Sequence, residues 1–188
     1  MFCFLVGSAL FPMRAFVRRG LEERSPKGKP VRSVEGDLNA VAGIKFIDHV
    51  AIAVKQGELE GQAKAYEMLG FKEIHREEVL GSDQVREVLL QIGDGPNLIQ
   101  LLEPLTSDSP VQKLIERNGG RGGLAHVAFR VENARQAFDA MKANGFQIID
   151  KAPRKGSRGT TVFFVHPKSR AENPFGFLIE IVEDPESK

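Results

Sequence analysis

Two stretches of the chain share an alternation of apolar and other residues that predicts a β-strand, and each stretch contains a histidine. They read "IDHVAIAV" at residues 47–54 and "LAHVAFRV" at residues 124–131. In both, the triplet His-Val-Ala is followed by an apolar residue, a variable residue and Val. His49 and His126 therefore occupy matched positions in two predicted strands, which indicates an internal repeat.

The same succession of elements follows each histidine strand. A helical stretch comes first, then a strand that begins after a Gly-Phe pair, and then two further strands separated by turn-forming residues. The helical stretches are residues 57–69 and 132–144, the Gly-Phe pairs are at 70–71 and 145–146, and the last strands are 84–92 and 97–103, then 160–166 and 175–183. The sequence therefore predicts an α+β fold with two tandem βαβββ modules.

The module boundaries follow from these elements. We expect the first module at residues 45–103 and the second at residues 123–188, joined by a linker at residues 104–122. The linker contains a predicted short helix with Ser109 as N-cap, Pro110 at its first position and Gln112 completing a capping box. Gly119 and Gly120 are expected to end this helix.

Residues 1–44 are interpreted as an extension outside the folded unit. Their apolar start, "MFCFLVGSALFPM", is shorter than the roughly 20 residues that span a bilayer and lacks the basic region that opens a secretory signal. A basic, proline-containing stretch follows. Two interpretations stay open, a functional arm or a start codon assigned too early, with Met13 as a later candidate. Glu22 and Glu23 argue against a mitochondrial presequence because they interrupt the basic run.

Composition narrows the range of functions. The net charge of +1 gives no case for nucleic acid or an anionic membrane as the main partner. The single cysteine, Cys3, cannot form an internal disulfide, and the cytoplasm is the expected compartment. The chain has no dinucleotide, P-loop or serine-hydrolase motif, so these activities have no support.

A second pair of polar residues extends the repeat. Gln100 and Glu180 each follow Leu-Ile in the last strand of a module, in rows of otherwise apolar side chains. A buried polar group requires a partner. Together with His49 and His126, they give two imidazoles, an amide oxygen and a carboxylate, a mixed nitrogen and oxygen set that suits a divalent metal such as a first-row ion or Mg²⁺.

From about Lys45 to Glu183 the chain resembles the vicinal-oxygen-chelate superfamily, and within it the methylmalonyl-CoA epimerase family. The matching segments are "IDHVAIAV", "LGFKEIHREEV", "LLEPLTSDSPVQKLIERNGGRGGLAHVAFRV", "VFFVHPKS" and "LIEI". The resemblance implies a curved mixed sheet around a metal held by His49, Gln100, His126 and Glu180. Three features depart from the family: Ala125 before His126, a longer loop "RAENPFG", and Ser157-Arg158 between two loop glycines.

The activity implied is metal-dependent epimerisation of methylmalonyl-CoA, or of a related 2-substituted malonyl-type acyl-CoA. It would proceed by 1,1-proton transfer through a metal-stabilised enolate, with Co, Mn, Mg, Ni or Zn as the ion and a homodimer as the assembly. Three alternatives remain: glyoxalase I (lactoylglutathione lyase), an extradiol dioxygenase, which a fourth ligand at Gln100 disfavours, and a metal-free binding protein of the bleomycin-resistance type.

Epimerisation requires two acid/base groups, one on each face of the α-carbon. Glu180 is the first candidate. Glu87 is the second, because it interrupts an apolar strand row and one branch of the family has a glutamate at the matching position; a solvated strand carboxylate is the alternative. The predicted substrate contacts are Lys168, Ser169, Arg158 and His166, whereas His75, among charged residues, is expected on the surface.

Overall fold

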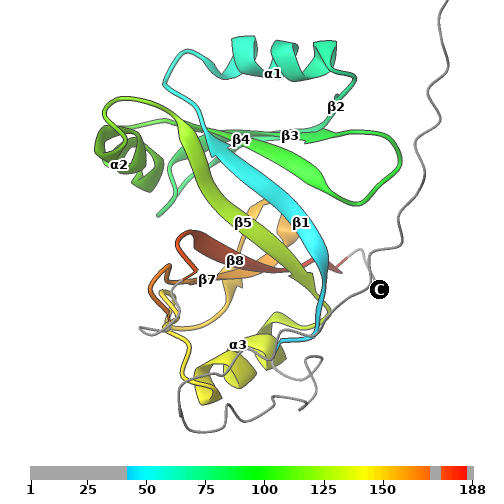
Figure 1. Ribbon diagram of the computed structural model, residues 1–188, viewed down its shortest axis with the longest axis vertical. Helices are drawn as coiled ribbons and strands as arrows, with labels where there is room; N and C mark the ends of the chain where they lie inside the picture. Colours follow the sequence, from blue (N-terminus) through cyan, green and yellow to red (C-terminus); the bar gives the residue numbers. More distant parts are fainter. Residues whose placement is uncertain (1–41, 170–174, 186–188) are drawn as a thin grey trace, which may run out of the picture. The chain divides into compact units, whose positions relative to one another are not determined.

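The computed structural model describes residues 42–169 and 175–185 of the chain. Nearly all of the predicted extension lies outside these residues, so its interpretation stays a prediction. The described part contains an eight-stranded mixed sheet in the order β2-β3-β4-β1-β5-β8-β7-β6, accompanied by helices (Figure 1). The predicted α+β fold is therefore confirmed.

Each half of the sheet has a βαβββ succession, as predicted. In the second half, however, the second strand is the two-residue strand Arg154–Lys155 and not the one expected directly after Gly145-Phe146, where Ile148 forms only an isolated bridge with Val165. The first comprises β1 (Ile44–Ala53), α1 (Leu59–Met68), β2 (Lys72–Val79), β3 (Val85–Gln91) and β4 (Leu98–Pro104). The second comprises β5 (Gly123–Val131), α3 (Ala134–Ala143), β6 (Arg154–Lys155), the 3₁₀ turn η1 (Ser157–Gly159), β7 (Thr161–Val165) and β8 (Leu178–Glu183). The helix α2 (Pro110–Arg117) lies between them in sequence.

The two histidine strands lie side by side at the centre of the sheet. β1 and β5 pair antiparallel with each other, and each pairs in parallel with the last strand of its own module, β4 or β8. The central order β4-β1-β5-β8 therefore brings together the four strands that carry the predicted metal ligands.

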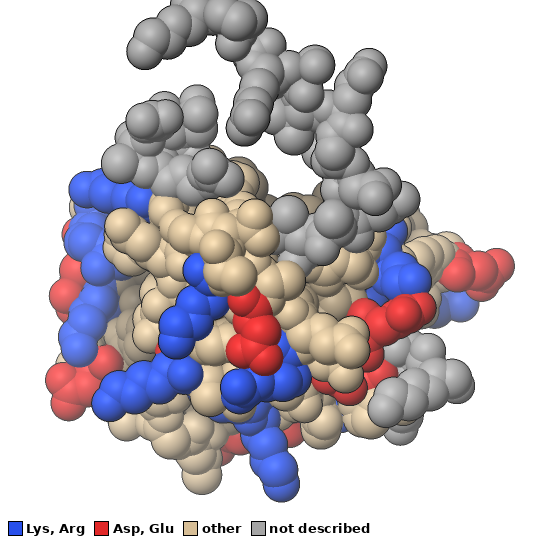
Figure 2. All heavy atoms as spheres, turned by 90° about the horizontal axis from the view of Figure 1, so that it is seen from below, with Lys and Arg blue, Asp and Glu red and all other residues tan. Residues whose placement is uncertain are grey.

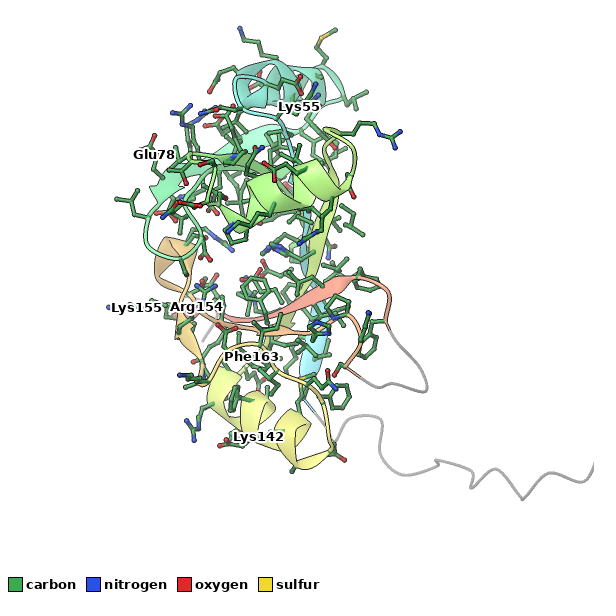
Figure 3. The ribbon with its side chains drawn as sticks, turned by 90° about the vertical axis from the view of Figure 1, so that its left-hand side faces the viewer. Lys55, Glu78, Lys142, Arg154, Lys155 and Phe163 are labelled. Carbon is green, nitrogen blue, oxygen red and sulfur yellow. The ribbon has the colours of Figure 1, made fainter. Side chains whose placement is uncertain are left out.

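Helices α1 and α3 cover one face of the sheet. Leu59 and Ala63 of α1 pack with Val88, Leu90 and Leu101 of the first module. In the second module the equivalent cluster joins α3 to β7 and β8. The rings of Phe138 and Phe163 meet edge to face at 5.3 Å, and Figure 3 labels Phe163 between the sheet and α3. Because strand side chains alternate, the residues between these apolar ones point to the opposite face.

Each of these helices begins against a glutamate from the end of its module. Glu103, the penultimate residue of β4, accepts hydrogen bonds through Oε1 from the backbone N–H groups of Gly57 (2.6 Å) and Leu59 (3.3 Å). Glu183, at the end of β8, accepts one from the N–H of Ala134 at 2.9 Å. A distant carboxylate therefore satisfies helix donors that otherwise lack partners. Neither glutamate is predicted from the sequence to cap a helix.

The linker helix has the predicted N-cap but not the predicted capping box. The hydroxyl of Ser109 accepts from the N–H of Val111 at 3.2 Å. The Gln112 side chain does not reach back to Ser109; it donates to Glu116 one turn onward, at 3.0 Å. The Ser109 N–H instead donates to the carbonyl of Thr106 at 3.3 Å, which leaves it unavailable to Gln112.

Charged side chains of both signs are interspersed over the face of the molecule seen in Figure 2. Within the described residues, no helix combines the length and the apolar character needed to cross a bilayer.

Candidate active site

Five neighbouring strands each contribute one buried polar side chain to the face of the sheet opposite α1 and α3. In the order β3-β4-β1-β5-β8 these are Glu87, Gln100, His49, His126 and Glu180, all at most 7% exposed. Small residues separate them. Ala51 lies opposite both Gln100 and His126, and Ala128 lies opposite both His49 and Glu180. The sheet therefore brings together every residue that the sequence analysis assigned as a ligand or base.

Three of these side chains meet in a triangle. The Nε2 atoms of His49 and His126 are 3.0 Å apart, and each lies 3.0 Å from Oε2 of Glu180. Bonds of about 2.1 Å to a divalent ion place adjacent octahedral ligands about 3.0 Å apart. The triangle therefore fits one face of such a coordination shell.

Gln100 supplies a further oxygen beside the triangle. Its amide nitrogen donates to Oε2 of Glu87 at 2.8 Å, which leaves its own Oε1 buried without a hydrogen-bond partner. A buried amide oxygen without a partner is costly unless a ligand satisfies it. With two imidazoles and a carboxylate, Gln100 completes the mixed donor set that a first-row divalent ion or Mg²⁺ accepts.

His49 is oriented by a buried carboxylate that the sequence analysis missed. Asp48 is fully buried and lies 2.8 Å from Nδ1 of His49. Asp48 is the extra residue of a β-bulge, because Ile47 and His49 pair with the consecutive residues Phe129 and Ala128. A bulge redirects a side chain that regular alternation would send to the other face. The carboxylate therefore favours the His49 tautomer whose Nε2 is free to bind a metal.

A second buried charge neutralises Asp48. Arg130 of β5 donates through Nε to Oδ2 of Asp48 at 2.6 Å, and its Nη2 also contacts Asp184 at 3.2 Å. The adjacent pair Asp48-His49 and the arginine four residues after His126 were visible in the sequence as polar residues in apolar strands. Their connection was not, because it depends on the bulge and on the β1–β5 register.

Burial and ion pairing act in opposite directions on these groups. Burial lowers the pKa of His49, but its contacts with Asp48 and Glu180 raise that pKa to about 9. Burial raises the pKa of Glu180, but His126 and His49 hold it below its usual range. The pKa of Glu87 is raised, chiefly by burial, although the nearby Ser157 opposes this. Glu87 is only 2% exposed, so the alternative of a solvated strand carboxylate is wrong.

The predicted substrate contacts lie in two places. Arg158 has a left-handed backbone (φ 54°), and its guanidinium faces Asp48 at 3.4 Å and Asp184 at 3.9 Å. It therefore supports the carboxylate behind His49. The other three occupy the turn after β7: the hydroxyl of the buried Ser169 accepts from the N–H of Gln147 at 2.8 Å, while Nδ1 of His166 accepts from the N–H of the exposed Lys168 at 3.0 Å. Their role in substrate binding stays a prediction.

His75 was expected on the surface, but it is only partly exposed and has a neighbouring carboxylate. Its side chain is 29% exposed, and its Nε2 lies 3.3 Å from Oε1 of Glu77. The two residues alternate on β2, and Glu77 pairs directly with Glu87 across the β2–β3 ladder. His75 therefore shares a face with Glu87, because His75 and Glu77 alternate regularly in the part of the ladder that follows the bulge at Ile74.

Comparison with known proteins identifies the class to which this fold and site belong. Residues 48–164 match the Glyoxalase/Bleomycin resistance protein/Dioxygenase superfamily, so the chain belongs to this superfamily. The ethylmalonyl-CoA/methylmalonyl-CoA epimerase of Cereibacter sphaeroides is 32% identical over 65% of this chain and 88% of its own. The resemblance to the methylmalonyl-CoA epimerase family is thereby confirmed.

Solved structures agree with this assignment. The crystal structure of methylmalonyl-CoA epimerase from Mycobacterium tuberculosis superposes with a TM-score of 0.68 at 29% identity, covering 79% of this chain and 94% of that one. A methylmalonyl-CoA epimerase in complex with methylmalonyl-CoA and NH₄⁺ gives a TM-score of 0.67 at 32% identity, covering 76% and 96%. The prediction of an epimerase-type enzyme is confirmed.

Proposed function

We propose that the protein is a metal-dependent epimerase of methylmalonyl-CoA, or of a related 2-substituted malonyl-type acyl-CoA, that acts by 1,1-proton transfer. The observation that carries this proposal is the row of five buried polar side chains across β3, β4, β1, β5 and β8. It combines a complete metal-ligand set with a carboxylate, Glu87, that the ligand set does not need. The epimerases to which the chain is similar support the substrate class.

His49, Gln100, His126 and Glu180 would hold the ion, which would be Co, Mn, Mg, Ni or Zn. Bound there, a divalent ion supplies positive charge beside the thioester and carboxylate oxygens of the substrate and so favours loss of the α-proton. Asp48 and Arg130 keep His49 in place, since the carboxylate holds the Nδ1 proton and the guanidinium neutralises the carboxylate.

Two carboxylates lie at the two ends of this row, and one of them, Glu180, is also a ligand. Glu180 projects from β8 and Glu87 from β3, and the three ligand-bearing strands β4, β1 and β5 lie between them. Gln100 holds Oε2 of Glu87 at 2.8 Å, which leaves Oε1, without a hydrogen-bond partner, able to take a proton. One carboxylate removes the α-proton from one face of the carbon, and the other delivers a proton to the opposite face.

The remaining predictions about the partners belong to this proposal. We expect the CoA moiety to contact Lys168, Ser169, Arg158 and His166, the active assembly to be a homodimer, and the compartment to be the cytoplasm. Arg158 would act mainly through Asp48, given the ion pair between them.

The test is to incubate one epimer of methylmalonyl-CoA with metal-loaded protein in D₂O. We expect racemisation together with deuterium at the α-carbon. If a protein that contains stoichiometric metal gives neither racemisation nor deuterium at the α-carbon, the proposal is overturned. Turnover of the methylglyoxal–glutathione adduct instead would identify glyoxalase I, and tight binding of a drug by a protein without divalent metal would identify a binding protein.

A further inference from the structure

Beside the candidate active site, a second group of ligand-type side chains lies on β2 and β3. It consists of His75, Glu77 and Glu87, each of which offers one ligand atom within 4.8 Å of the others. Glu77 and Glu87 are directly paired across the ladder, and His75 is two residues from Glu77 on the same strand. The strand pairing therefore fixes the Cα positions of the three residues, and all three side chains point to the same face of the sheet.

Two of these atoms are buried without a hydrogen-bond partner. Oε1 of Glu87 has none, although the residue is only 2% exposed, and Nε2 of His75 has none either. His75 Nε2 lies 3.3 Å from Oε1 of Glu77 but makes no hydrogen bond with it. Buried polar atoms are rarely left in this state, so these two atoms point to a ligand. Oε1 of Glu77 accepts from the N–H of Arg158 at 3.0 Å and keeps a further lone pair for the same ligand.

The separation and chemistry of the group suit a cation. Two ligands bonded at about 2.0 Å to a tetrahedral Zn²⁺ lie about 3.3 Å apart, the separation of His75 Nε2 and Glu77 Oε1. An imidazole and two carboxylates form a ligand set that Zn²⁺ and similar ions accept. The side chains of His75 and Glu77 are 29% and 34% exposed, so the group lies near the surface, with His75 Nε2 itself buried.

We infer that His75, Glu77 and Glu87 form a second divalent-cation site, weaker than the first, whose occupation inhibits the enzyme. The site is distinct from the triangle of His49, His126 and Glu180 but is linked to it through Gln100, which donates to Oε2 of Glu87 at 2.8 Å. An ion on Oε1 of Glu87 occupies the lone pair that would take the α-proton. The inhibitory effect rests on the proposed function; the binding site does not.

The binding test is calorimetric titration of the metal-free full-length protein with Zn²⁺, with metal content checked by elemental analysis. We expect a tight equivalent and a weaker one. His75→Ala and Glu77→Gln should each remove the weaker equivalent and retain the tight one, while His126→Ala should remove the tight one. The matched control is Glu78→Gln, because Glu78 neighbours Glu77, points away and pairs with Arg86 at 3.2 Å (Figure 3); it should retain both.

A single equivalent in the wild-type protein, or two equivalents in both His75→Ala and Glu77→Gln, would overturn the site. Both variants change partly exposed residues, and thermal melting checks that they remain folded. In the activity measurement, excess Zn²⁺ should inhibit the wild type and not His75→Ala; equal inhibition of the two would refute the regulatory role. If no epimerisation occurs under any condition, the proposed function fails, but the stoichiometry still decides whether the site exists.

Discussion

Equivalent positions in the two modules carry different chemistry. The last strand of the first module presents Gln100, a neutral amide, whereas the last strand of the second presents Glu180, a carboxylate 3.0 Å from both histidines. The amide nitrogen of Gln100 points away from the histidines and donates a hydrogen bond to Glu87. The repeated scaffold places the four ligands, and the differences between the modules give them different roles. In the second module Glu180 is both a ligand and a base. In the first module the ligand Gln100 holds a separate base, Glu87.

The histidines differ in the same way. His49 follows Asp48, which binds its Nδ1, whereas His126 follows Ala125. The ring of His126 instead meets Phe164 edge to face at 5.4 Å. The first module therefore orients its histidine by a charged hydrogen bond, and the second orients its histidine by packing.

The largest loss of activity is expected from Glu180→Gln, which gives the last strand of the second module the same residue as Gln100 in the first. This substitution removes a ligand charge and a base together. We expect metal affinity to fall, and epimerisation to fall by at least the roughly 10²–10⁴-fold contributed by general-base catalysis. Metal titration and racemisation assays measure the two effects. Glu183→Gln, on the same strand but directed to α3, is the control and should retain activity.

The next largest effect separates the base of the first module from its ligand. Glu87→Gln should retain the metal in the first site but reduce epimerisation by roughly 10²–10⁴-fold. Exchange of the α-proton in one epimer should be less impaired than full epimerisation, because Glu180 still serves its own face. Proton NMR in D₂O resolves the two rates. Near-normal epimerisation would remove Glu87 from the mechanism.

A smaller effect is expected from Asp48→Asn, which replaces the carboxylate beside Nδ1 of His49 with a neutral amide and so makes His49 more like His126. The amide oxygen can still accept the Nδ1 proton, but the negative charge that strengthens His49 as a ligand is lost. We expect metal affinity to fall by roughly 10–100-fold, as for other residues behind metal-bound histidines. Competition with a chelator measures it. Asp184→Asn, which removes a carboxylate from Arg130 without touching His49, should change affinity less; equal losses would contradict the orienting role.

The parts of this molecule that the sequence predicted are those governed by regular alternation. The period of two along each strand, repeated in both modules, places His49, Gln100, His126 and Glu180 on one face without reference to tertiary structure. The same rule placed Glu87 in an apolar row, where the structure buries it. Repetition strengthened the assignment because each residue has a counterpart.

The features that were missed depend on irregular backbone or on contacts distant in sequence. Asp48 reaches His49 because a bulge turns it out of regular alternation. The capping box failed at Gln112 because Thr106 already accepts the Ser109 N–H. The residues that flank the start of α1 gave no sign that Glu103, more than 40 residues later, would cap it.

The helix caps give the smallest and last comparison between the modules. Glu103 accepts two N–H groups at the start of α1, where the local residue Glu58 makes no side-chain cap, and its other oxygen pairs with Arg86 at 3.1 Å. Glu183 accepts one N–H of α3. This helix already has a local cap, because Oδ1 of Asn133 accepts the N–H of Gln136.

We therefore expect Glu103→Ala to lower the free energy of unfolding by about 2 kcal/mol and Glu183→Ala by about 0.5 kcal/mol, the two ends of the range measured for helix caps. Urea unfolding followed by circular dichroism measures both. Glu103→Gln, which retains the acceptor oxygen but not the charge, should fall between Glu103→Ala and the wild type. Of the two helices, only α3 has a local side-chain cap, so equal losses for the two alanine variants would show that Asn133 does not compensate for Glu183.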